Sequence, residues 1–305
     1  MKSKRGVCLL LGLMLWQLPV CVSRAQEPTD YKALLWHHLK NVVEFGPRPP
    51  GSHAHAELRR YIKNVGGRFA DSVREITFTY PAPDGEMLVM HNVEFHFEGR
   101  ERGRPVLLGA HYDTRRFADE DPDPANQTEP IVGANDGGSG TAELLALAQY
   151  FKEHPPRRPV RLVFFDGEDY GKKFTENYFI GSKRYAADLG RASAEERPFC
   201  VLVIDMVGDR DLDIYKEVYS NENARWLVDL VFGAAEKRGA RAFHSKPRYT
   251  IRDDHLPFLQ MGIPAAVLID FDYPYWHTQE DTLDKCSEES LYEVFQVVVD
   301  AVNQM

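Results

Sequence analysis

Hydrophobic positions along this chain change their spacing, and each spacing predicts a different element. Residues 30–43 carry apolar side chains at helical intervals. The Pro- and Gly-rich segment 46–52 ends this helix, and Ser52 has the short hydroxyl side chain that caps helices. We therefore expect a second helix that begins after Ser52 and reaches Ile62.

Two runs with alternating apolar side chains follow the predicted helices. They cover residues 73–80 and 89–98, and the turn-forming segment 81–85 separates them. Alternation is typical of strands with one face buried, and the short connection favours an antiparallel pair.

Beyond residue 105 the pattern changes to short, continuously apolar runs separated by longer runs with helical spacing. Strands that alternate with helices predict a three-layer α/β/α sandwich, with a central mixed, mostly parallel sheet and an antiparallel edge. No linker divides residues 26–305, so we expect a single domain. The expected strands are 106–110, 159–165, 199–206 and 264–269, and the expected helices are 140–152, 181–189, 223–237 and 287–303.

The first 25 residues have the composition of a secretory signal. Basic residues open the chain, residues 7–18 are apolar, and Ser23 and Ala25 are the small residues that signal peptidase requires. The apolar stretch is short for a membrane span, although an uncleaved anchor is the alternative. We expect residues 1–25 to be removed and the protein to be exported, to the periplasm or the medium.

Charge and cysteine content narrow the possible partners. Loss of residues 1–25 removes four basic side chains and moves the formal charge from -9 to -13. An acidic body argues against nucleic acid and against a stable membrane partner. Only Cys200 and Cys286 remain after cleavage, which is too few for a disulfide scaffold, and we expect no bridge between them. We expect a monomer.

Acids and histidines recur where the predicted strands end. Parallel strands bring their carboxyl ends to one edge of a sheet, which is where α/β proteins bind ligands. Glu168 and Asp169 are the most informative pair, because neighbouring side chains on a turn diverge and can serve a metal and a proton separately. A solvated acidic turn is the alternative for this pair. The segments are His111-Tyr112-Asp113, Asn135-Asp136, Glu168-Asp169, 205–208 and Trp276-His277, with Asp253-Asp254-His255 in a further loop.

Three of these side chains form a ligand set that suits zinc. A catalytic zinc takes three nitrogen or oxygen ligands and keeps one open position. Asp136, Asp169 and His277 can supply them. Taken alone, Asp136 could instead cap the helix that follows it, and His277 could be an ordinary structural histidine. The histidines of the first two helices, His37, His38, His53 and His55, are expected at solvated positions.

The order of these motifs resembles the zinc-dependent exopeptidases of peptidase family M28, and among them most closely the glutaminyl cyclases. The resemblance begins at residues 45–52 and covers nearly all of the chain after the signal. Three features favour the cyclases: Trp276 directly before His277, the loop 253–258, and Asp169 where most aminopeptidases have Glu. The resemblance implies a single zinc-dependent catalytic domain.

The resemblance also implies a role for each residue. One zinc is expected on Asp136, Asp169 and His277. Glu168 is expected to be the general acid and base, with Asp205 and Asp253 as a hydrogen-bonded acidic pair beside it. The expected substrate pocket is lined by Trp276, Ile251, Tyr273 and Phe174. A two-zinc aminopeptidase would add His111 and Asp205 as ligands of a second zinc, with Asp113 orienting His111.

The activity implied is the conversion of N-terminal glutamine, on peptides or proteins, to pyroglutamate with release of ammonia. A secreted two-zinc aminopeptidase is the rival, because every ligand for it is present. A catalytically inactive homologue used as a binding domain is a third possibility, against which the intact Glu168 and zinc ligands argue.

Overall fold

The structure is a computed structural model that describes residues 28–83, 85–173 and 175–305. The predicted secretory signal and Phe174 lie outside these residues. The helices are α1 (Tyr31–Glu44), α2 (His53–Val65), α3 (Gly138–Glu153), α4 (Ile180–Leu189), α5 (Val218–Asn223), α6 (Arg225–Arg238), α7 (Leu256–Gln260) and α8 (Glu288–Gln304), with a 3-10 turn at Leu283–Lys285. The strands are β1 (Ser72–Pro81), β2 (Met87–Phe97), β3 (Val106–His111), β4 (Val160–Phe165), β5 (Cys200–Asp205), β6 (Ile214–Lys216), β7 (Phe243–Pro247) and β8 (Ala265–Ile269).

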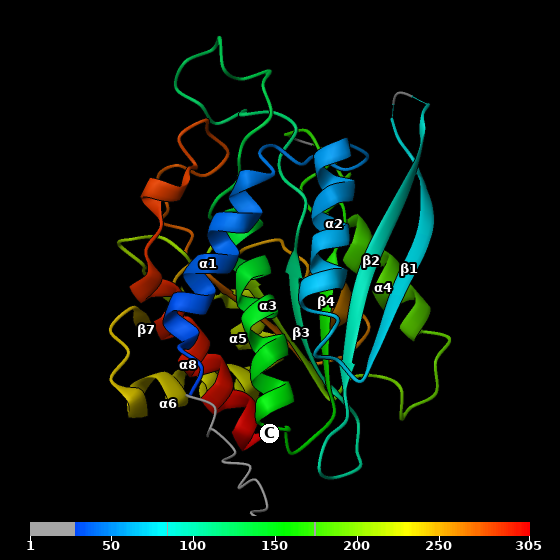
Figure 1. Cartoon of the computed structure of the whole chain (residues 1–305), viewed down its shortest axis with the longest axis vertical. Coiled ribbons are helices and arrows are strands. Elements are labelled where there is room, and N and C mark those ends of the chain that lie inside the picture. Colours follow the sequence, from blue (N-terminus) through cyan, green and yellow to red (C-terminus); the bar gives the residue numbers. More distant parts are fainter. Residues whose placement is uncertain (1–27, 84, 174) are drawn as a thin grey trace, which may run out of the picture.

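Six strands form the central sheet in the order β1-β2-β4-β3-β5-β8. The four strands β4, β3, β5 and β8 are parallel, while β2 runs antiparallel to both β1 and β4. The mixed sheet with an antiparallel edge is therefore confirmed. In Figure 1, β3 points upward, so that its carboxyl end is directed away from the chain's C-terminus.

Alternate side chains of the parallel strands enter two separate cores, one on each face of the sheet. Leu108 of β3 packs into the core that contains residues of α1, α2, α3, α6 and α8. Leu107, its neighbour, packs into the other core, with residues of α4 and α7. The sheet is covered on both faces, as its continuously apolar strands predict. In Figure 1, α1, α3 and α8 lie together in front of the sheet.

Helix α3 lies unusually close to the sheet at Gly140. A Cβ atom at this position would collide with the carbonyl oxygen of Ile204 and lie 2.9 Å from Cβ of Ala110. Only glycine permits this approach. The loop that precedes α3, and Asp136 with it, is thereby held at the carboxyl edge of the sheet.

Two sequence-based expectations about the helices need correction. His38 and His55 are buried rather than solvated. His55 stacks on the ring of Tyr112 at a centroid distance of 4.5 Å, and its Nε2 lies 3.1 Å from Asp166 Oδ1. The helix expected at 223–237 is present as α6, but the short helix α5 that precedes it was not predicted; Ala224 departs from helical geometry between the two.

Cys200 and Cys286 are buried free thiols. Among the described residues, no helix is both long and apolar enough to cross a membrane.

Candidate active site

The predicted strand-end residues converge on one cavity at the carboxyl edge of the sheet. Its volume is about 520 Å3. Loops after β3, β4, β5 and β8, and the loop before α7, contribute to its lining, as the parallel topology requires. Of the residues singled out in the sequence, the cavity is lined by Asp136, Glu168, Asp169, Asp205, Ile251, Asp253, Trp276 and His277.

Asp136, Asp169 and His277 bring three ligand atoms together. His277 Nε2 lies 3.4 Å from Asp136 Oδ2 and 3.3 Å from Asp169 Oδ2, and all three residues are buried. Ligands of a tetrahedral zinc, at bond lengths of about 2.0–2.1 Å, lie about 3.3–3.4 Å apart. In the part of the chain that the structure describes, neither of these carboxylate oxygens has a hydrogen-bond partner. Buried, unpartnered oxygens that face an imidazole nitrogen fit a metal ion.

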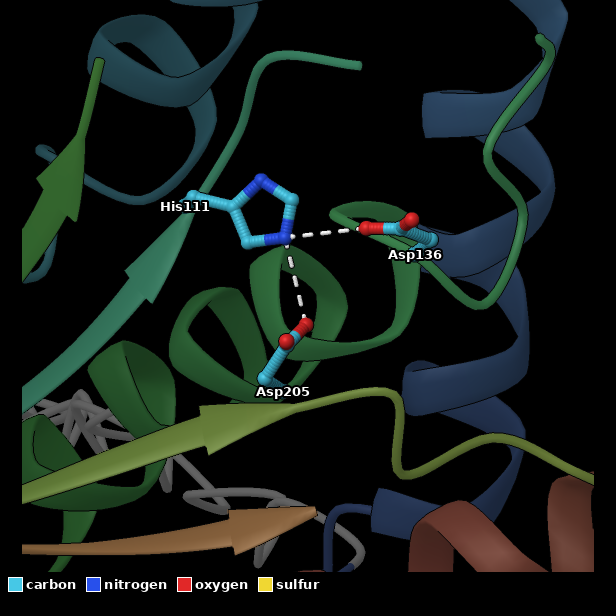
Figure 2. Close-up of side chains that lie close together, drawn as sticks. All are labelled: His111, Asp136 and Asp205. Atoms are coloured by element: carbon cyan, nitrogen blue, oxygen red, sulfur yellow. Dashed lines mark hydrogen bonds and ion pairs between the residues drawn. The ribbon is translucent and has the colours of Figure 1, made fainter. Parts of the chain in front are cut away.

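A second set of side chains shares Asp136 with the first. His111 Nε2 lies 3.2 Å from Asp136 Oδ1 and 3.2 Å from Asp205 Oδ1 (Figure 2). Asp136 thus presents Oδ2 to one set and Oδ1 to the other. Burial alone would lower the pKa of His111, but Asp205, Asp113 and Asp136 together raise it well above its usual value. This arrangement also has the donor types of a metal site.

Asp136 does not cap the helix that follows. The N-cap of α3 is Gly137, at φ 78°, and it makes no side-chain capping bond. Asp281 holds the backbone before α3 instead, accepting hydrogen bonds from the N–H groups of Asn135 (2.8 Å) and Asp136 (3.1 Å). Burial and the nearby Asp136 carboxylate raise the pKa of Asp281 to about 7.

Asp113 fixes the backbone of the turn that carries Glu168 and Asp169. Its carboxylate accepts hydrogen bonds from the backbone N–H groups of Gly167 (3.0 Å), Glu168 (3.2 Å) and Asp169 (3.1 Å). Its Oδ1 also lies 3.7 Å from His111 Nδ1. Asp113 therefore holds the acidic turn in place, and its carboxylate lies beside His111.

The surroundings of Glu168 and Asp169 shift the pKa values of the two carboxyls in opposite directions. Burial and the neighbouring Asp169 carboxylate raise the pKa of Glu168 well above its usual value. Burial also acts to raise the pKa of Asp169, but His277 and Arg115 outweigh it, and the net pKa is lowered. One carboxyl can therefore exchange protons, while the other stays ionised as a ligand must.

Asp205 and Asp253 both line the cavity, and their carboxyls interact electrostatically. Asp205 faces His111, and Asp253 accepts a hydrogen bond from the backbone of Asp254. Burial and the Asp205 carboxylate raise the pKa of Asp253 well above its usual value. Two buried carboxyls this close cannot both ionise without a large cost.

The cavity wall differs in part from the prediction. Trp276 stacks on His277 at a centroid distance of 3.8 Å, and Ile251 lines the cavity as expected. Tyr273 does not line it, because its hydroxyl turns away to donate a 2.8 Å hydrogen bond to Asp281. Phe271 lines the cavity instead of Tyr273, and its ring packs against Trp276 at a centroid distance of 5.4 Å. Phe174, also predicted for this wall, lies outside the described residues.

Backbone strain concentrates at the site. In the described part of the chain, the non-glycine residues with positive φ are Phe179 (57°), Met206 (43°) and His277 (54°), and all three line the cavity. Such conformations cost roughly 1–3 kcal/mol each and persist where the surrounding structure enforces them. Their position at the cavity is typical of a functional site.

Arg115 and Asp281 were not predicted from the sequence, and Asp119 was expected at most in an acidic loop at the rim of the site. Arg115 is 1% exposed, and its Nη1 lies 2.9 Å from Asp169 Oδ1. Asp119 Oδ1 lies 3.6 Å from His277 Nδ1. Arg115 alone had a signal in the sequence. It is a charged residue four positions after the apolar strand that ends at His111, and therefore near the carboxyl edge of the sheet.

Comparisons with known proteins agree with the geometry. The model of peptidase family M28 matches residues 92–302. The glutaminyl-peptide cyclotransferase of Gloydius blomhoffii is 27% identical over 320 residues, which cover 92% of this chain and 83% of that protein. The solved glutaminyl cyclase of Tannerella forsythia is 32% identical, with a TM-score of 0.84, over 91% of this chain and 100% of that one. A leucine aminopeptidase precursor from Bacteroides thetaiotaomicron VPI-5482 is 30% identical, with a TM-score of 0.85, over 92% of this chain and 99% of that one.

Proposed function

Because the chain belongs to peptidase family M28, we propose that it is a zinc-dependent glutaminyl-peptide cyclotransferase. It converts N-terminal glutamine of peptides and proteins to pyroglutamate and releases ammonia. The observation that carries this proposal is the likeness, over nearly the whole described chain, to proteins named glutaminyl cyclase. The cavity with its buried acids and zinc-like ligand set supports it.

Asp136, Asp169 and His277 hold one zinc in this proposal. Their atoms have the spacing of a tetrahedral site, and the two carboxylate oxygens that face His277 have no hydrogen-bond partner within residues 28–83, 85–173 and 175–305. Zinc bound there supplies a Lewis acid for the side-chain amide of the substrate glutamine. Trp276, which stacks on His277 and lines the cavity, packs against that side chain.

Glu168 moves the proton. The substrate's α-amine nitrogen bonds to its own side-chain amide carbon, and Glu168 takes the proton that the amine loses. The bond from that carbon to the amide nitrogen then breaks, and Glu168 returns the proton to the departing ammonia. Its raised pKa brings Glu168 toward the working range of a group that both accepts and donates.

Asp205 and Asp253 complete the acidic side of the cavity. Asp253, with its raised pKa, is the member of this pair that holds a proton. Ring closure is unimolecular, so the main task of the cavity walls is to select the folded-back conformer of glutamine. Ile251 and Phe271 narrow the cavity for this purpose.

Incubation of the purified protein with a glutamine-initiated peptide tests the activity. We expect stoichiometric ammonia and a peptide of unchanged length that has lost one ammonia in mass. The same peptide with an acetylated N-terminus is the control, because its amine cannot attack. Release of free amino acids without ammonia from the open peptide would reject the proposal.

The specific observation that favours a second candidate is the set His111, Asp136 and Asp205. If it holds a second metal, the site is that of a two-zinc aminopeptidase, and Glu168 activates a water. Metal analysis separates the two functions: we expect one tightly bound zinc per chain, and two zincs with amino-acid release would favour the aminopeptidase.

Export to the periplasm or the medium and the monomeric state remain part of the proposal. Export rests on residues 1–25. The mass of the protein recovered from its native host, and its elution volume on gel filtration, test them.

A further inference from the structure

Arg115 uses all five of its N–H groups at the edge of the proposed zinc site. Nε and Nη2 donate to the two oxygens of Asp119, at 2.8 and 2.5 Å. Nη1 donates to Asp169 Oδ1 and to the carbonyl of Gly171, both at 2.9 Å. The second Nη2 proton goes to the hydroxyl of Tyr178, also at 2.9 Å. A fully satisfied guanidinium has no freedom to turn, so its contact with Asp169 is fixed.

The two oxygens of Asp169 are consequently different. Oδ1 accepts from Arg115, while Oδ2 has no hydrogen-bond partner among the described residues and lies 3.3 Å from His277 Nε2. The backbone N–H of Asp169 is held separately by Asp113, which leaves the carboxylate little room to rotate. The side chain can therefore offer a metal one oxygen, but not both.

The surroundings of Arg115 are built for this contact. Gly171 lets the ring of Tyr178 lie against its backbone, since a Cβ there would come within 2.5 Å of that ring. Asp119, which pairs with Arg115 through both oxygens, also lies 3.6 Å from His277 Nδ1. The Arg115–Asp119 pair thus contacts two of the three proposed ligands, Asp169 through Arg115 and His277 through Asp119.

We infer that Arg115 is a positioning residue that restricts Asp169 to one-oxygen coordination and so keeps the fourth metal position open for substrate. This inference rests on the zinc site of the proposed function. A carboxylate that bound through both oxygens would fill the position that a catalytic zinc keeps free. Outer partners of metal ligands commonly act on metal sites in this way.

Cobalt(II) substitution tests the inference, because four-coordinate cobalt absorbs visible light much more strongly than five-coordinate cobalt. We expect the unmodified protein to show the intense spectrum. Arg115→Met frees the second oxygen of Asp169, and the visible absorption should lose intensity. With zinc, kcat should fall about 10- to 100-fold, the range typical for outer partners of metal ligands, with a smaller change in KM.

Tyr178→Phe is the matched control. It removes one of the five Arg115 hydrogen bonds but leaves those to Asp119 and Asp169, so the cobalt spectrum should lose much less intensity than in Arg115→Met. Arg115→Lys keeps the buried charge but lacks the fork that holds Asp119 and Asp169 together, and it should resemble Arg115→Met. This variant carries the test if Arg115→Met does not fold.

An unchanged cobalt spectrum in the Arg115 variants overturns the inference even if turnover falls. Failure to bind cobalt at all also overturns it, because the inference requires a loaded site. The spectrum reports on coordination whether or not ammonia is released. Loss of the cyclase proposal and loss of this inference are therefore distinguishable.

Discussion

Glu168 and Asp169 are adjacent in the chain but have different neighbours. Asp169 faces His277 and Arg115, whereas the nearest ion-pair partner of Glu168 among the described residues is His111, whose Nδ1 lies 4.0 Å from its carboxyl. Both backbone N–H groups are fixed by Asp113, so the two side chains cannot exchange places. The difference in partners predicts a difference in what each variant loses.

Glu168→Gln should retain zinc and lose turnover by about 10²- to 10⁴-fold, the usual contribution of a general acid and base. The glutamine keeps the shape of the side chain but cannot accept the amine proton. Asp169→Ala should weaken zinc binding itself, because it removes one ligand of three. Zinc content by elemental analysis, alongside ammonia release, measures both effects. Equal loss of zinc in the two variants would contradict this separation of roles.

Sequence reasoning found the residues that face the cavity and missed those behind them. Asp136, Asp169 and His277 follow strand ends, where a spacing pattern can place them. Arg115 acquires its role through Asp169, 54 residues away, and no local pattern reports that approach. Tyr273 was misplaced because one rotation of its side chain toward Asp281 takes it off the cavity wall.

Among the elements, α3 depends on its close contact with the sheet. Gly140→Ala should destabilise the fold by about 1–3 kcal/mol, the usual cost of overpacking, and weaken zinc binding by shifting Asp136. Urea unfolding and chelator competition measure the two effects. Gly233 in α6 is the matched control, since a Cβ there would meet nothing within 4 Å. Gly233→Ala should stabilise by up to about 1 kcal/mol, and a similar gain at Gly140 would refute the packing argument.

Helix α5 depends on one buried carboxylate for its N-terminus. Glu217 accepts hydrogen bonds from the N–H groups of Tyr219 (2.9 Å), Ser220 (2.6 Å) and Ile251 (3.0 Å), and it lies 3.3 Å from His255 Nε2. Burial acts to raise the pKa of Glu217, but His255 and these N–H groups lower it to about 2.

This lowered pKa predicts an acid-labile contribution to stability. The folded-state pKa is below the usual 4.5, so the stabilisation is fully present above pH 4.5 and disappears as the pH falls through about 2. It amounts to roughly 3 kcal/mol. Urea unfolding at several pH values should show a steeper loss between pH 4.5 and 2 for the unmodified protein than for Glu217→Gln. Parallel curves would exclude this role of Glu217.

The elements of the central sheet were predictable, and the small sheet was not. Strands such as β3 are uninterrupted apolar runs, and burial on both faces produces that pattern. β6 and β7 have three and five residues, and β7 has no buried residue. Strands this short and exposed lack the periodicity on which a sequence-based prediction depends.

At the scale of the whole molecule, the proposed zinc links three separate loops. Asp136 precedes α3, Asp169 follows β4, and His277 follows β8. A ligand that binds only the folded state raises its stability. Removal of zinc with a chelator should therefore lower Tm, and added zinc should restore it. Asp169→Ala is the control, and a Tm of the unmodified protein that does not respond to zinc would count against the site.

Asp136 has a consequence for how such a protein can evolve. It offers one oxygen to His277 and the other to His111, so a substitution at Asp136 alters both ligand sets at once. Selection for a different metal content must then act on residues that belong to one set, either His111 and Asp205 or Asp169 and His277. We expect Asp136 to be retained both in related proteins that bind one metal and in those that bind two.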